Sequence, residues 1–238
     1  YYLRQLNISL PTFLGIACLV FIPASELALS LTNLVLTHII PPKNLPKFEL
    51  SNGIPDKAKT IVVIPCMLSE TKVINELIEK LEIHYLGNSD KQLFYALLTD
   101  FTDSKSESQP NDQDFISTAL NGIKKLNQKY AAHGSEKFFL FHRNRQWNSS
   151  ENVWMGWERK RGKLQEFNCL LREGTNTSFA ISTAPSDLLP TIRFVITLDA
   201  DTRLPRDSAR KLVGTILHPL NQPHFDKELG RVTEGYGI

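Results

Sequence analysis

The chain has 238 residues, carries 27 Lys and Arg against 25 Asp and Glu for a net charge of +2, and is 42 % hydrophobic. This is the composition of an ordinary globular protein, and it excludes a largely disordered chain. The small net charge argues against a dedicated nucleic-acid binder, although a local basic patch is compatible with it.

The three cysteines, Cys18, Cys66 and Cys169, are widely spaced and form no C-x-x-C pair. They therefore support neither a disulfide framework nor a thiolate zinc site, and a reducing compartment fits them best. The sequence begins with Tyr1 and ends at Ile238 without the composition of a tail. We therefore expect it to be a fragment of a longer protein.

The N-terminal stretch has the pattern of a membrane-spanning helix. No charged residue occurs from Gln5 to Ser25, and residues 10–24 are almost wholly apolar. A helix over this window reaches about 30 Å, the thickness of the hydrocarbon core of a bilayer. A signal peptide is a competing interpretation, which the isolated Arg4 disfavours. A buried core helix is the other alternative.

A second amphipathic helix is predicted to follow and to lie along the membrane interface. Pro23 is expected in the last turn of the first helix, and apolar residues after Glu26 then recur at spacings of three and four up to Ile39. Lysines follow this stretch, so the positive-inside tendency puts the remainder of the chain in the cytoplasm. We assign residues 1–42 to the membrane and interfacial segment and 43–238 to a soluble domain.

From Lys57 onward, short β-branched or aromatic runs alternate with helical periodicity. The pattern predicts strands at 60–64, 93–98, 138–141 and 193–198, and helices at 73–85, 115–130, 163–172 and 207–217. Residues 101–111 and 176–190 are expected to be polar loops. Because the strands lack polar alternation and are joined by helices, the predicted fold class is α/β, with a mostly parallel sheet covered by helices on both faces.

Acidic residues follow two of the predicted strands, where open parallel sheets bind their ligands. The triplet D-A-D at 199–201 has the D-x-D form with which nucleotide-sugar transferases hold a divalent cation on a diphosphate. Two carboxylates one residue apart can bind the same hard cation, so Asp199 and Asp201 are candidate ligands of Mg²⁺ or Mn²⁺. Helix capping is the alternative, and it is our interpretation of a second copy, D-Q-D at 112–114.

Asp100 and Asp103 follow the second predicted strand and could accept hydrogen bonds from a base or a ribose. An Asx-turn explains the same residues, Asp103 in particular.

The window 143–163 combines an excess of cations with all three tryptophans of the chain, Trp147, Trp154 and Trp157. Cations can hold a diphosphate, and aromatic faces can stack on sugar rings. A groove for single-stranded nucleic acid has the same composition, and a solvated surface loop is the simplest alternative. The spacing of Gly156 and Gly162 does not match a P-loop, and no G-x-G-x-x-G is present.

Together, these motifs resemble the glycosyltransferase domain of cyclic β-1,2-glucan synthases. The resemblance runs from about residue 42 to 238 and rests on T-D-x-T-D at 99–103, H-R-x-R-Q-W-N at 142–148, W-M-G-W-E-R-K-R-G-K-L at 154–164 and V-I-T-L-D-A-D-T-R-L-P at 195–205. It implies a glycosyltransferase A-type fold in a large protein of the bacterial inner membrane. The implied reaction is inverting transfer of glucose from UDP-glucose to a growing β-1,2-glucan, and the implied partners are the bilayer and the rest of the polypeptide, without nucleic acid.

The resemblance also assigns roles to individual residues. Asp100 matches the acidic residue that contacts uridine, Lys163 would face the diphosphate, and the catalytic base is expected downstream of Ile238, Glu234 not being assigned. The expected donor-binding residues are Asp100, Asp103, Arg143, Trp157, Lys163 and Asn168, and the expected metal ligands are Asp199 and Asp201. A polysaccharide synthase of other sugar specificity and a nucleic-acid-binding domain are the alternatives.

Overall fold

The computed structural model describes residues 9–42, 44–131, 134, 136–172 and 177–235. The chain divides into two units, Tyr1–Leu45 and Pro46–Ile238, and each is described by itself.

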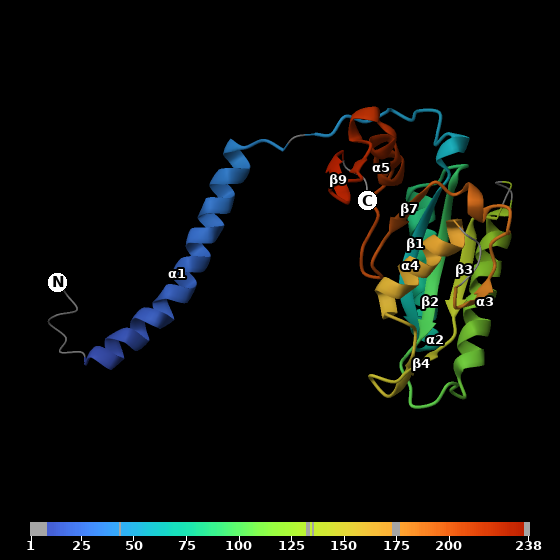
Figure 1. Cartoon of the computed structure of the whole chain (residues 1–238), viewed down its shortest axis with the longest axis horizontal. Coiled ribbons are helices and arrows are strands. Elements are labelled where there is room, and N and C mark those ends of the chain that lie inside the picture. The colour runs from blue at the N-terminus through green and yellow to red at the C-terminus, as the bar shows by residue number, and fades with distance from the viewer. Residues whose placement is uncertain (1–8, 43, 132–133, 135, 173–176, 236–238) are drawn as a thin grey trace. The chain divides into compact units, whose positions relative to one another are not determined.

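The first unit contains one long apolar helix, α1 (Leu10–Ile39), of 30 residues (Figure 1). Its N-terminus is capped by Ser9, whose side chain accepts a hydrogen bond from the backbone N–H of Thr12. The prediction of two successive helices is wrong, because Pro23 lies inside α1. A proline removes only one backbone donor, and the surrounding apolar sequence keeps the helix continuous on both sides of it.

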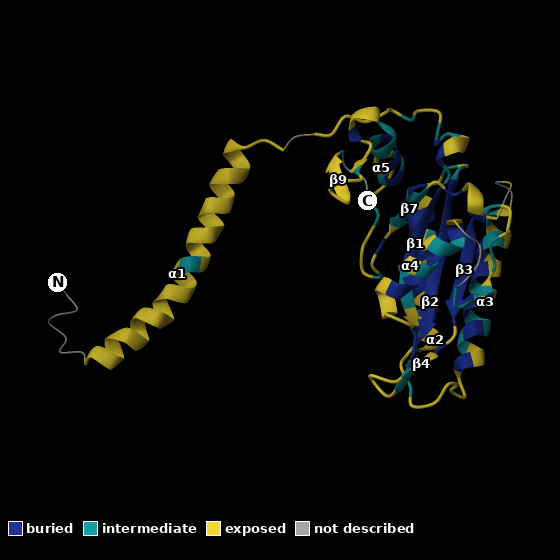
Figure 2. Cartoon of the chain, viewed as in Figure 1, coloured by how far each residue is buried: buried dark blue, intermediate teal, exposed yellow. Residues whose placement is uncertain are grey.

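The helix α1 has the length and composition of a membrane span. An 18-residue window of it reaches a mean hydropathy of 2.0, and none of its residues is buried (Figure 2). By length and composition, α1 is therefore able to cross a membrane.

The second unit is built on a five-stranded sheet with the order β6-β3-β2-β1-β7 (Figure 1). All neighbouring strands are parallel except β6, which runs antiparallel to β3 at the edge. The strands are β1 (Thr60–Leu68), β2 (Leu93–Phe101), β3 (Phe138–Arg143), β6 (Phe179–Ser182) and β7 (Phe194–Thr197). The predicted class, α/β with a mostly parallel sheet, is confirmed.

Helices cover both faces of this sheet. Side chains of α2 (Thr71–Gly87), α3 (Asp112–Lys129) and α5 (Ser208–Leu217) pack in one cluster, and α4 (Arg159–Arg172) packs in the other through Phe167 and Leu171. The central strand β2 is buried along its whole length, Tyr95 and Leu97 facing the first cluster and Phe94 facing the second. Burial on both faces explains why its sequence is continuously apolar.

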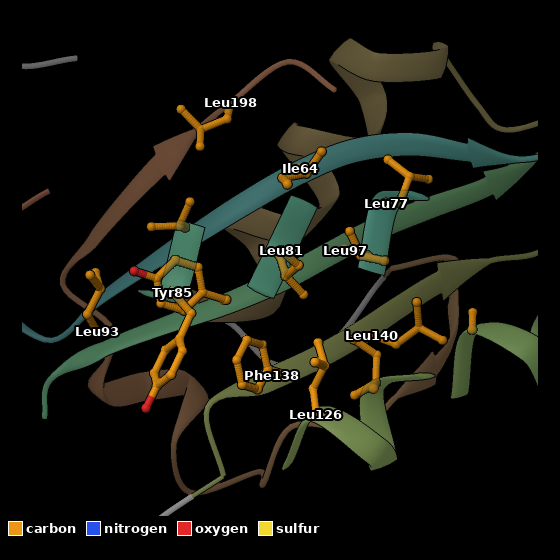
Figure 3. Packing of buried hydrophobic residues seen from close by; sticks show 14 of the residues in the cluster. Ile64, Leu77, Leu81, Tyr85, Leu93, Leu97, Leu126, Phe138, Leu140 and Leu198 are labelled. Carbon is orange, nitrogen blue, oxygen red and sulfur yellow. The ribbon is translucent and has the colours of Figure 1, made fainter. Parts of the chain in front are cut away.

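The first cluster is the larger one and fixes α2 and α3 on the sheet. Leu81 and Tyr85 of α2 lie over Leu97 of β2 and Phe138 of β3 (Figure 3). Tyr85 and Phe138 meet edge to face with ring centroids 5.0 Å apart. Such aromatic contacts add to the stabilisation from apolar burial.

Several short strands were not predicted, some outside the main sheet and one at its edge. Two hairpins occur, β4–β5 and β8–β9, and the edge strand β6 lies within the expected loop 176–190. In β6, Phe179 packs against the second core cluster and Ile181 against the first, and the residues that follow each are exposed. Partly buried and exposed side chains thus alternate, but over only four residues. The hairpin strands are β4 (Gln146–Asn148), β5 (Val153–Met155), β8 (His224–Asp226) and β9 (Arg231–Glu234).

The first residues of the second unit are held against α5. The backbone N–H of Phe48 donates to the carbonyl of Gly214 at 3.0 Å, and Asn221 donates to the carbonyl of Pro46 at 2.6 Å. A Cβ on Gly214 would lie 2.4 Å from the Phe48 carbonyl oxygen, so only glycine permits this approach.

Deleting residues 1–42 is expected to leave the midpoint of thermal unfolding of the second unit unchanged, because its contacts begin at Pro46. Deleting residues 1–52 removes the Phe48 contacts and is expected to lower the midpoint by several degrees. Circular dichroism melts of both proteins test this. Unfolding of the shorter deletion would show that α1 is part of the core.

Candidate functional site

A cavity of about 420 Å³, here called the strand-end cavity, opens where the parallel strands end. It is lined by the last residues of β1 and β2, by the segment that leads into α4, and by Ala200 after β7. Its charged lining residues are Asp100, Asp103, Arg159, Lys160 and Lys163. The predicted ligand edge of the sheet therefore holds a cavity in which acids and cations converge.

Asp100 lies at the end of β2 and is only 4 % exposed. The parallel register places it beside Arg143 of β3, whose guanidinium donates to both carboxylate oxygens at 2.8 and 2.9 Å. The ammonium group of Lys163 lies 3.1 Å from the same carboxylate. Two buried cations thus hold one buried carboxylate, an arrangement in which each partner depends on the others.

Arg143 has no exposed side-chain surface. Besides Asp100, it donates to the carbonyls of Trp157 and Arg159 at 3.2 and 3.1 Å and lies 3.3 Å from a carboxylate oxygen of Glu166. Arg143 is not among the residues that line the cavity. It holds Asp100 and the chain entering α4 in position.

The chain entering α4 passes through a strained turn. Glu158 and Arg159 both have left-handed backbone conformations, with φ of 49° and 46°. Each such residue costs roughly 1–2 kcal/mol when it is not glycine. A strained backbone of this kind persists where surrounding contacts hold it in place. Here Arg143 donates hydrogen bonds to the carbonyls on both sides of Glu158.

Gly156 lies against the buried carboxylate. A Cβ at this position would lie 2.6 Å from Asp100 and 3.0 Å from the guanidinium of Arg143. Only a residue without a side chain therefore fits between the hairpin β4–β5 and the Asp100–Arg143 pair.

Replacing Gly156 by alanine is expected to lower the free energy of unfolding by about 1–3 kcal/mol through overpacking. Gly87→Ala is the matched control, since its Cβ would meet nothing closer than 3.9 Å. Denaturant unfolding of the two variants tests this, and equal stabilities would show that the neighbours of Gly156 can move aside.

Lys163 lies in the first turns of α4 and is buried. Its ammonium donates to the backbone carbonyl of Cys66 at 2.5 Å, at the end of β1. Burial lowers the pKa of Lys163, and the nearby carboxylate of Asp100 acts in the opposite direction. Burial also raises the pKa of the Cys66 thiol to about 12, so Cys66 stays protonated and is not a nucleophile.

The two predicted metal ligands follow β7 and are exposed. Asp199 forms an ion pair with Lys160, and Lys80 of α2 donates to the carbonyl of Ala200 between the two acids at 2.9 Å. No group of three or more His, Cys, Asp or Glu side chains that could hold a metal occurs among the described residues. Neither acid lines the strand-end cavity, and Asp201 lines a separate cavity with residues of α2. Two carboxylates completed by phosphate oxygens are a typical donor set for Mg²⁺.

The other predicted donor residues lie in different places. Asp103 lines the strand-end cavity and pairs with Arg159 at 2.8 Å. Trp157 lines a neighbouring cavity instead, and Asn168 is exposed on α4, outside the residues that line the strand-end cavity. The structure thus brings Asp100, Asp103 and Lys163 together.

The cations of the window 143–163 do not form an open basic groove, because each is paired with a carboxylate. Arg145 is buried against Asp112, which was predicted to cap α3 and instead anchors this arginine. The remaining pairs are Arg143–Asp100, Arg159–Asp103, Arg159–Glu151, Lys160–Asp199, Arg161–Glu158 and Lys163–Asp100. Each of these cations therefore has an acidic partner within the chain.

Sequence reasoning missed several residues of the site. Arg159 and Lys160 line the cavity, and Gly156 permits the close packing at its base. They stand in the W-M-G-W-E-R-K-R-G-K-L motif, but the partners that give them a role come from β2 and from the segment after β7.

No family model matches the chain. Over 218 residues, or 91 % of its length, the chain is 44 % identical to the cyclic beta-(1,2)-glucan synthase NdvB of Rhizobium meliloti (strain 1021). This similarity confirms the resemblance predicted from the motifs. The chain spans 8 % of that relative's length and corresponds to a small part of it.

Proposed function

From this relationship to a glucan synthase, we propose that the chain is the nucleotide-sugar-binding part of an inverting glucosyltransferase with a glycosyltransferase A-type fold. The donor is UDP-glucose, and the product is β-1,2-glucan. The observation that carries the proposal is the strand-end cavity, in which the buried carboxylate of Asp100 meets the cations Lys160 and Lys163, and Lys160 is paired with Asp199 of the D-x-D.

The uridine end of the donor is assigned to Asp100 and Asp103, which line the cavity and supply acceptor oxygens. Arg143 acts through Asp100. Because its guanidinium binds both carboxylate oxygens, it fixes their orientation before any ligand enters.

The diphosphate is assigned to Lys160 and Lys163, the cations of α4 that line the cavity. Fixed positive groups at this place stabilise the charge that develops on the departing UDP, which is the usual form of electrostatic catalysis in enzymes. A Mg²⁺ or Mn²⁺ ion held by Asp199 and Asp201 would neutralise part of the same charge. An α-linked donor gives a β-linked product only if the acceptor hydroxyl attacks from the opposite face, so we propose inversion.

The membrane location is part of the same proposal. We assign α1 to the bacterial inner membrane and the second unit to its cytoplasmic face. The support is the apolar length of α1 and the lysines that follow it in the sequence, and the relative is a bacterial protein.

Replacing Lys163 by alanine is expected to weaken UDP-glucose binding at least tenfold, because a buried cation beside the diphosphate is lost. The fold should persist, since Asp100 keeps its two hydrogen bonds to Arg143. Tryptophan fluorescence titration measures the affinity. The control is Lys129→Ala, which removes an exposed lysine of α3 that pairs with Glu82 of α2. Equal affinities in the two variants would remove Lys163 from the donor site.

A further inference from the structure

A second cavity of about 550 Å³, here called the hairpin cavity, lies next to the strand-end cavity. It is formed by the hairpin β4–β5, by the turn that joins its strands, and by residues 157–159. The proposed donor site does not use it, although Trp157, which the sequence placed at the donor, is one of its lining residues.

Two tryptophans present exposed surface around this cavity. Trp147 is 50 % exposed and Trp157 is 42 % exposed, and both line it. The amide side chains of Gln146 and Asn148 and the hydroxyl groups of the turn serines complete the lining. Flat aromatic faces beside amide and hydroxyl groups suit a ligand that has apolar ring faces and many hydroxyl groups.

The charge of the hairpin cavity differs from that of its neighbour. Its charged lining residues are Glu151, Glu158 and Arg159, so acids predominate. The guanidinium of Arg159 is itself paired with Glu151 at 2.8 Å. Glu158 is paired in turn with Arg161, so the lining offers no unpaired cation to a diphosphate or a nucleic acid, whereas a neutral ligand needs none.

Arg159 separates the two cavities and lines both. The same nitrogen of its guanidinium binds Asp103 on one side and Glu151 on the other, each at 2.8 Å. The strained turn at Glu158 and Arg159 puts the guanidinium in this position. A ligand in the hairpin cavity would therefore lie beside Asp103, at the end of the strand-end cavity that is assigned to the uridine.

We propose that the hairpin cavity binds a neutral oligosaccharide, the growing glucan chain, with Trp147 as its stacking platform. This inference rests on the proposed function for the identity of the sugar. It gives the protein a place to hold the glucan chain beside the nucleotide end of the donor.

The test is calorimetric titration of the full chain in detergent micelles with a β-1,2-linked glucopentaose. Trp147→Ala is expected to weaken binding about tenfold, a typical effect of removing an aromatic anchor, and Trp147→Phe should retain most of the affinity. Ser150→Leu, which narrows the cavity without touching a tryptophan, should also weaken binding. Phe225→Ala, at an exposed aromatic residue of β8, is the control and should not change it.

A parallel titration with UDP-glucose and Mn²⁺ separates this inference from the proposed function. Unchanged glucopentaose affinity in both Trp147→Ala and Ser150→Leu would overturn the inference, as would the absence of glucopentaose binding to a chain that binds UDP-glucose. Equal weakening of UDP-glucose by Trp147→Ala would also overturn it, since the cavity would then hold the donor. Glucopentaose binding without UDP-glucose binding would support the hairpin cavity and contradict the proposed donor.

Discussion

Replacing Asp100 by alanine is expected to lower the free energy of unfolding by about 3–5 kcal/mol, the usual cost of removing one partner from a buried ion pair. The carboxylate is the shared partner of Arg143 and Lys163, both of which are buried. Without it, two cations would remain in the protein interior with only carbonyl groups and the more distant Glu166 to stabilise them.

Asp103→Ala is the matched control for this prediction. Asp103 follows Asp100 closely in the sequence and is exposed. It shares Arg159 with Glu151, so the arginine keeps a partner when Asp103 is lost. Its removal is expected to cost less than about 1 kcal/mol. Urea unfolding measures the free energy of unfolding of both variants. Similar losses in the two would show that the Asp100 pair does not organise the site.

The hydrogen bonds from Arg143 to Asp100 also favour ligand binding. When the carboxylate that accepts hydrogen bonds from the ligand is already oriented, binding costs less free energy for ordering side chains. Arg143 provides this orientation from below and also holds the turn that carries Arg159. The same buried residue thus connects the strand-end cavity with the wall of the hairpin cavity.

The sheet was predictable because burial on two faces leaves a clear sequence signal. The run 93–98 is apolar at every position and the run 60–64 at all but Thr60, and they lie within the central strands β2 and β1. The edge strand β6 was missed, since four residues with one partner strand carry too little periodicity. Pro23 was over-interpreted, because an apolar helix can continue through one missing backbone donor.

The site was predictable in its position but not in its contacts. Strand ends indicated Asp100, and the motif around Gly162 indicated Lys163, and both line the cavity. The role of Arg143 was not visible, because a local sequence window shows charges but not the partners that the fold brings to them. Asp112 illustrates the same limit, since its partner Arg145 is far away in the sequence.

The proposed function depends most on Asp199 and Asp201, which we propose bind a divalent cation together with the diphosphate of the donor. If they do, Mn²⁺ and UDP together stabilise the folded chain by RT ln(1 + [L]/Kd), about 2.7 kcal/mol at a hundredfold excess over Kd. Asp201 is exposed, so Asp201→Asn alone should cost little stability. Asp201 caps no helix, because α5 begins at Ser208 with Asp207 as its N-cap residue, so loss of a cap does not complicate the variant.

Thermal melts of the wild-type chain and of Asp201→Asn, each with and without Mn²⁺ plus UDP, test this claim most directly. We predict a clear upward shift of the wild-type midpoint when both ligands are present, a small shift with UDP alone, and no additional effect of Mn²⁺ on the variant. Identical shifts in the two proteins would contradict the metal assignment and, with it, the proposed donor chemistry.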